Sequence, residues 1–172
     1  MTFQYLKNKN KGIKCISCYY SINSEEHRKY CDTVLMGSRK EIPIKDFNKT
    51  LMTYGLGGCT GIIIYNKTKN TIFMGHHPFK DIINEWINEY KFDDVIIYLK
   101  IHIQYEKIDG NQYYTEKTPS FYKKYESFKN IKFIIETYNN ISNDSCHSTL
   151  YCKKNENNEI CYSKWGIWKI LE

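Results

Sequence analysis

The feature that most constrains this chain is a pair of short apolar runs separated by a polar break. The first run, Gly61–Tyr65, follows a glycine-rich segment that ends at Cys59-Thr60, and the second run, Thr71–Met74, leads into Gly75-His76. Apolar runs of this length around the break Asn66–Lys69 are typical of a β-hairpin with a four-residue loop. We therefore expect strands over about 60–65 and 71–76.

This hairpin would bring a thiol and an imidazole together. If Tyr65 pairs with Asn70, Cys59 and His76 lie directly opposite each other on one face, where Cβ atoms are about 4.5–5.5 Å apart. A slip of one residue would turn one of them to the other face. His77 faces the other way and is the weaker candidate for a base.

The surroundings of Cys59 suit a nucleophile. A cysteine nucleophile needs a base beside it, a group that orients the base, and donors for the oxyanion. Gly55, Gly57 and Gly58 allow positive φ and leave the nearby N–H groups open to a substrate carbonyl. The same residues also fit a purely structural interpretation, with a small buried cysteine at a strand entry and a histidine at a hairpin end.

The pattern Thr53-x-Gly55-Leu56-Gly57-x-Cys59, followed by a strand, a turn and a strand ending at His76, resembles the CheD-type chemoreceptor glutamine deamidases. Leu56-Gly57-Gly58-Cys59 is also similar to the Leu-x-Gly-Cys element of bacterial toxin deamidases. The resemblance covers about residues 50–78. It implies a β-sandwich-like core with helices outside, and a catalytic group of Cys59, His76 and Thr53 without a cofactor.

The activity implied is hydrolysis of a glutamine side-chain amide in a target protein, through a thioester on Cys59. Backbone N–H groups around Gly58 and Cys59 would hold the oxyanion, with Gly57 and Gly55 shaping the turn. The link His76-His77-Pro78 is shorter than in the family, and Gln104-Tyr105 lacks the family's glycines. A chemoreceptor substrate is therefore not carried over, and a viral or parasite protein acting on another target is at least as well supported.

Two alternatives remain. One is a Cys–His thiol hydrolase or peptidase that acts on another acyl substrate. The other is a non-catalytic binding module that uses a tyrosine-rich surface, since the chain has 16 tyrosines.

Composition bounds the protein class. The 172 residues suffice for one domain, 1–172, and the chain contains no alanine, which indicates an AT-rich coding genome. Its lysines are spread over the whole chain, so the net charge of +6 marks no nucleic-acid surface. We expect a cytoplasmic protein with reduced thiols and no membrane association, because no signal peptide or long apolar run is evident.

The spacing of Cys15, Cys18, His27 and Cys31 fits no familiar zinc site, so we expect no metal.

The remaining segments predict an α+β fold with a mixed sheet. The expected strands are 32–36, 50–54, 95–103, 131–136, 148–152 and 159–162, and the expected helices are 24–30, 79–90 and 121–128. The helix 79–90 is the clearest, because its apolar residues recur at helical spacing. Residues 104–120 are expected to form a loop, and Trp165, Ile167 and Trp168 to close the core.

Overall fold

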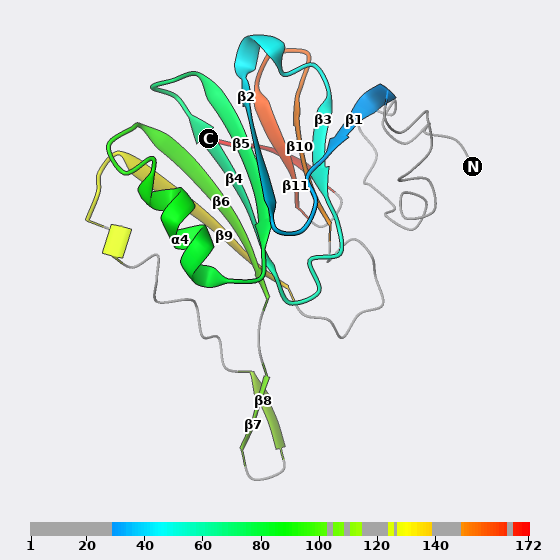
Figure 1. The fold of residues 1–172 in the computed structure, drawn as a ribbon, viewed down its shortest axis with the longest axis vertical. Coiled ribbons are helices and arrows are strands. Elements are labelled where there is room, and N and C mark those ends of the chain that lie inside the picture. Colours follow the sequence, from blue (N-terminus) through cyan, green and yellow to red (C-terminus); the bar gives the residue numbers. More distant parts are fainter. Residues whose placement is uncertain are drawn as a thin grey trace.

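The core of the protein is built from two five-stranded sheets in the part of the chain that the computed structural model describes (Figure 1). The model describes residues 29–102, 105–108, 111–114, 124–125, 127–138, 149–164 and 167–172. The β3 sheet has the order β1 (Cys31–Thr33), β3 (Thr50–Thr53), β10 (Leu150–Lys154), β11 (Ile160–Lys164) and β12 (Ile167–Ile170). The β4 sheet has the order β2 (Ser38–Pro43), β5 (Thr71–His77), β4 (Thr60–Asn66), β6 (Val95–His102) and β9 (Ile131–Tyr138).

Both sheets are mixed. β1 pairs with β3, and β6 with β9, in parallel, whereas the other pairs within the two sheets are antiparallel. β7 (Tyr105–Ile108) and β8 (Asn111–Tyr114) form a separate antiparallel pair. The helical elements described over their full length are α4 (Lys80–Asn88) and the short 3-10 helix η1 (Ile44–Asp46).

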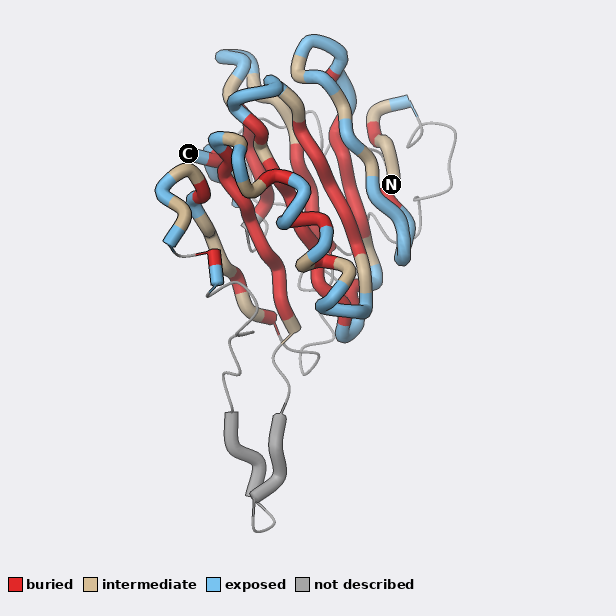
Figure 2. Tube along the Cα trace, turned by 60° about the vertical axis from the view of Figure 1, so that its left-hand side comes forward, coloured by how far each residue is buried: buried red, intermediate tan, exposed pale blue. Residues whose placement is uncertain are grey.

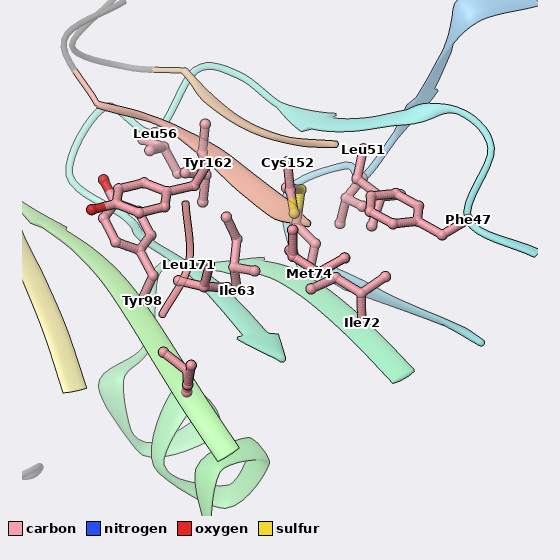
Figure 3. Close-up of a cluster of buried hydrophobic side chains, with 14 of the residues drawn as sticks. Phe47, Leu51, Leu56, Ile63, Ile72, Met74, Tyr98, Cys152, Tyr162 and Leu171 are labelled. Carbon is pink, nitrogen blue, oxygen red and sulfur yellow. The ribbon is translucent and has the colours of Figure 1, made fainter. Parts of the chain in front are cut away.

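The two sheets pack against each other through their inner faces (Figure 3). Leu51, Cys152 and Tyr162 from the β3 sheet share one buried cluster with Ile63 and Met74 from the β4 sheet. Face-to-face packing of this kind defines a sandwich core. The sheet-rich core expected from the sequence is therefore present, as two mixed sheets.

The outer face of the β4 sheet is covered by α4 (Figures 1 and 2). Ile83, Trp86 and Ile87 of the helix are buried against Ile64 and Phe73. The apolar stripe of 79–90 is thus a core-facing surface, except for Phe79, which is 67% exposed. The central strands β4 and β6 are consequently buried on both faces.

The β4–β5 hairpin is confirmed, but its register is not the expected one. Asn66 pairs with Thr71, so the four-residue loop is 67–70 and Gly61, not Cys59, lies opposite His76. Asn66 fits this position because its side-chain oxygen accepts from the Lys69 N–H and its amide donates to Asp93. The correction moves each pairing by two residues, so Cys59 and His76 stay on the same face.

Several other expectations are corrected. β1 ends at Thr33, and the expected strand residues Leu35 and Met36 lie in an exposed turn. The expected loop 104–120 contains the β7–β8 pair. Ile167 is 59% exposed, and Leu171 enters the core in its place. Most of the expected helices 24–30 and 121–128, together with Trp165, lie outside the described residues.

Among the described residues, none forms a helix long and apolar enough to cross a bilayer.

A close approach between strand and helix gives the first testable prediction. A Cβ on Gly75 would overlap Cζ3 of Trp86 and lie 2.8 Å from its Cε3. Gly75→Ala should therefore lower the free energy of unfolding by about 1–3 kcal/mol, the usual cost of overpacking. Denaturant unfolding of the two single variants and the double variant Gly75→Ala/Trp86→Leu measures the coupling. Because a smaller side chain at position 86 removes the overlap, the double variant should lose less unfolding free energy than the two single variants lose in total. Losses that add strictly would contradict the contact.

Candidate active site

A buried hydrogen bond joins the two sheets at one end of the sandwich. Thr53, the last residue of β3, lies with Oγ1 2.8 Å from Nδ1 of His76, near the end of β5. Thr53 is 0% exposed and His76 is 1% exposed. The structure therefore brings together two of the three residues that the sequence singled out, although they belong to different sheets.

The second ring nitrogen of His76 has no hydrogen-bond partner among the described residues. When Nδ1 carries the ring hydrogen, it donates to Thr53 Oγ1 and leaves the lone pair of Nε2 available as a base. Burial, and secondarily the neighbouring His77, lowers the pKa of His76 to about 4. The imidazole is therefore neutral at neutral pH, the form that can accept a proton.

Cys59 lies just before β4 and is 7% exposed. Extending the β4–β5 register by two residues beyond Gly61 sets Cys59 diagonal to His76, a position at which residues of paired strands are about 7–8 Å apart, with their Cβ atoms somewhat closer. Cys59 also belongs to the buried cluster between the two sheets. Burial raises the pKa of its thiol. The resting site thus holds a neutral thiol and a neutral imidazole that are neighbours but not directly opposed.

The glycine turn before Cys59 has the expected backbone conformation. The φ angles of Gly55, Gly57 and Gly58 are +67°, +31° and +120°, a region that other residues rarely adopt. Leu56 within this turn is fully buried and anchors it in the core between the sheets.

The two N–H groups expected to hold an oxyanion are already occupied. The Cys59 N–H donates to the carbonyl oxygen of Leu56. The Gly58 N–H donates to Oη of Tyr138 at 3.2 Å, and that hydroxyl donates to the carbonyl oxygen of Cys59 at 2.7 Å. An open oxyanion hole at these groups is therefore not a feature of the resting structure, because internal acceptors bind both donors.

Polar side chains continue from this site across the β4 sheet. His76, Gly61, Lys100 and Glu136 are paired in one row over β5, β4, β6 and β9. Gly61 contributes no side chain, and a Cβ there would lie 3.0 Å from Cδ2 of Leu150. Leu150 therefore approaches the β4 backbone between the histidine and the lysine.

Lys100 and Glu136 form a buried ion pair. Their Nζ and Oε1 atoms are 3.3 Å apart, and the two side chains are 1% and 2% exposed. Lys100 Nζ donates to the carbonyl oxygen of Thr149, and Tyr98 Oη donates to Oε2 of Glu136 at 2.8 Å. Burial lowers the pKa of Lys100, and the Glu136 carboxylate opposes this shift.

The next row contains residues that the sequence did not indicate. Extending the β4–β6 register by two residues sets Cys59 level with His102, and His102 is paired with Tyr138. The rings of His102 and Tyr138 pack edge to face with centroids 5.2 Å apart. No local signal in the sequence could reveal this row, because it depends on the parallel pairing of β6 with the distant β9.

His77 faces the other side of the sheet, as expected. Its ring packs against Phe79 and Trp86, and its Nδ1 accepts a hydrogen bond from the Phe79 N–H. It therefore belongs to the layer beneath α4 and does not reach Cys59.

Most of the cysteine and histidine residues that were compared with zinc sites are not described by the structure. Cys15, Cys18 and His27 lie outside the described residues. Within the described ranges, no group of three or more His, Cys, Asp or Glu side chains could hold a metal ion.

Comparison with known proteins places the chain in no family. No model of a protein family matches the sequence, and a search of curated proteins finds no similar one. The chemistry must therefore be inferred from the geometry of the site.

The buried histidine predicts a specific pH dependence. The folded pKa of His76, about 4, lies below the value of about 6.5 for a histidine in an unfolded chain. The unfolded state therefore binds more protons below pH 6.5, and His76 makes the protein lose stability as the pH falls from about 6.5 to about 4. Denaturant unfolding of the wild type and His76→Gln across this range isolates the effect. The wild type should lose more stability than the variant, and parallel pH curves would contradict the shift.

Proposed function

We propose that the protein is a protein-glutamine deamidase that uses Cys59 as nucleophile and His76 as base. The observation that carries this proposal is the buried Thr53–His76 hydrogen bond, which leaves Nε2 of His76 unpartnered on the face shared with Cys59. A nucleophile, a base and a group that orients the base are the minimum set for covalent acyl transfer. The proposal includes a deamidase-like fold and a protein substrate with an exposed glutamine.

The chemistry would proceed in two stages. His76 Nε2 takes the thiol proton, and the Cys59 thiolate attacks the carboxamide carbon to give a tetrahedral oxyanion. The imidazolium then protonates the leaving nitrogen, ammonia departs, and a thioester remains. His76 next removes a proton from water, which attacks the thioester and releases glutamate and the free thiol.

Burial sets the main energetic requirement of the first step. Transfer of a proton from Cys59 to His76 creates an ion pair at a site where burial disfavours each ion separately. The ion pair is stabilised only if the two charges lie close together, because Coulomb attraction rises as distance falls. Activation therefore requires Cys59 to move from its diagonal position toward His76 when substrate binds.

A reducing compartment suits this chemistry. The nucleophile is effective only as a thiolate, and disulfides are rare in the cytosol. A cytoplasmic location is accordingly part of the proposal.

Two structural observations favour a non-catalytic alternative. The Gly58 and Cys59 N–H groups both have internal acceptors, and Cys59 is only 7% exposed. A binding module with a structural cysteine would need neither an open oxyanion hole nor an accessible thiol.

Ammonia release from a panel of glutamine-containing proteins and peptides tests the proposal. Cys59→Ser should abolish release, because a hydroxyl is a far weaker nucleophile than a thiolate. His76→Ala should lower kcat by roughly 10²–10⁴-fold, the usual contribution of a general base. The double variant should be no worse than Cys59→Ser alone, since the two residues act as a unit. Thr53→Ala should lose less, because Thr53 only orients the ring.

Matched controls come from residues outside the site. His77→Gln alters the neighbouring histidine in the layer beneath α4, and Cys161→Ser alters a buried thiol that contacts the Glu159 carbonyl oxygen. Both should retain wild-type release. Peptide cleavage without ammonia would support the thiol hydrolase, and absence of both activities in the wild type would support the binding module.

A further inference from the structure

Tyr138 makes two hydrogen bonds to the turn that carries Cys59. Its Oη accepts from the Gly58 N–H at 3.2 Å and donates to the Cys59 carbonyl oxygen at 2.7 Å. Tyr138 is 1% exposed and ends β9, an edge strand of the β4 sheet. One hydroxyl therefore bridges the N–H group of Gly58 and the carbonyl oxygen of the next residue, the proposed nucleophile Cys59.

The ring of Tyr138 is held in place by its neighbour on β6. Its ring packs edge to face on His102, the residue paired with it on β6. Burial raises the pKa of Tyr138 above its ordinary value, so the hydroxyl remains a neutral donor at neutral pH. A neutral hydroxyl can accept from one backbone group and donate to the other at the same time.

We propose that Tyr138 is a positioning residue that holds the nucleophile turn in a closed resting state. A second part of the inference rests on the proposed function: the substrate carboxamide oxygen replaces the phenol oxygen as the acceptor of the Gly58 N–H. The same exchange releases the Cys59 carbonyl, so the Cys59 backbone becomes free to shift toward His76. Occupation of the Gly58 donor and closure of the site are then consequences of one hydroxyl.

The substitution Tyr138→Phe removes this hydroxyl and keeps the ring that packs on His102. The matched control is Tyr125→Phe, because Tyr125 is also buried and its hydroxyl donates to Asn84 of α4 on the outer face of the β4 sheet. Both variants lose one buried tyrosine hydroxyl, and only Tyr138→Phe affects the turn.

Two measurements report how often the turn opens in the absence of substrate. Amide hydrogen exchange at Gly58, followed by NMR, should accelerate about fivefold or more in Tyr138→Phe, the factor expected for loss of one buried hydrogen bond. Alkylation of Cys59 by iodoacetamide at neutral pH, followed by peptide mass analysis, should accelerate by a similar factor. Cys152 is 0% exposed in the sandwich core and serves as an internal reference for global opening. Its alkylation should stay unchanged, as should Gly58 exchange and Cys59 alkylation in Tyr125→Phe.

Two results would overturn the positioning role. One is a Cys59 alkylation rate in Tyr138→Phe that equals that of Tyr125→Phe. The other is equal acceleration at Cys59 and Cys152, which would show that the hydroxyl stabilises the whole fold. If Tyr138→Phe does not fold, wild-type exchange decides: Gly58 should exchange more slowly than Gly57, whose N–H is not hydrogen-bonded within the described residues, and equal rates would refute the closed state.

Ammonia release separates this inference from the proposed function. If the wild type is a deamidase, Tyr138→Phe should have undiminished or higher kcat/KM, because substrate no longer competes with the phenol for Gly58. A large loss of kcat/KM would overturn the exchange of acceptors. If the wild type releases no ammonia but Cys59 alkylation still accelerates, the deamidase proposal fails and the positioning role stands.

Discussion

The pairing of β4 with both β5 and β6 is the constraint on which the rest of the structure depends. β4 is buried on both faces, so its register decides which neighbouring side chains enter the sandwich core and which pack beneath α4. Directly paired residues of adjacent strands lie on the same face of the sheet, so His76 and Lys100, both paired with Gly61, must point inward together. A glycine between two large polar side chains leaves space that Leu150 approaches. The position of the candidate site therefore follows from the pairing of β4 with β5 and β6 and not from the glycine turn alone.

Local patterns in the sequence were sufficient for the elements that carry the site and insufficient for the contacts between them. The hairpin, the helix that contains Trp86 and the positive φ angles of the glycine turn all follow from signals within a few residues. The hairpin register depended on whether Asn66 belonged to the strand or to the loop, and in the strand its amide donates to Asp93, a contact that local patterns do not reveal. Preservation of the shared face of Cys59 and His76 reflects only the even size of the error.

Long-range contacts explain what the sequence could not supply. The bond between Thr53 and His76 crosses from one sheet to the other, and the family resemblance, not residue spacing, suggested the pairing. Tyr138 reaches the nucleophile turn only because β9 lies parallel to β6 after a long connection. A tyrosine in a chain with 16 of them carries no local mark of such a role. For the same reason, the glycine-rich motif did not reveal that the Gly58 N–H donates to Tyr138.

The buried pair of Lys100 and Glu136 has a consequence for how the chain assembles. The two residues are directly paired across β6 and β9, strands whose parallel contact must form between distant parts of the chain. A slip of one residue would place the charges on opposite faces of the sheet, each buried in an apolar layer without its counterion. Removing one partner from a buried ion pair typically costs about 3–5 kcal/mol, far more than a misplaced aliphatic side chain in a strand rich in isoleucine. The buried ion pair therefore favours the observed register of β6 and β9 over registers displaced by one residue, among apolar strands that offer few other distinguishing contacts.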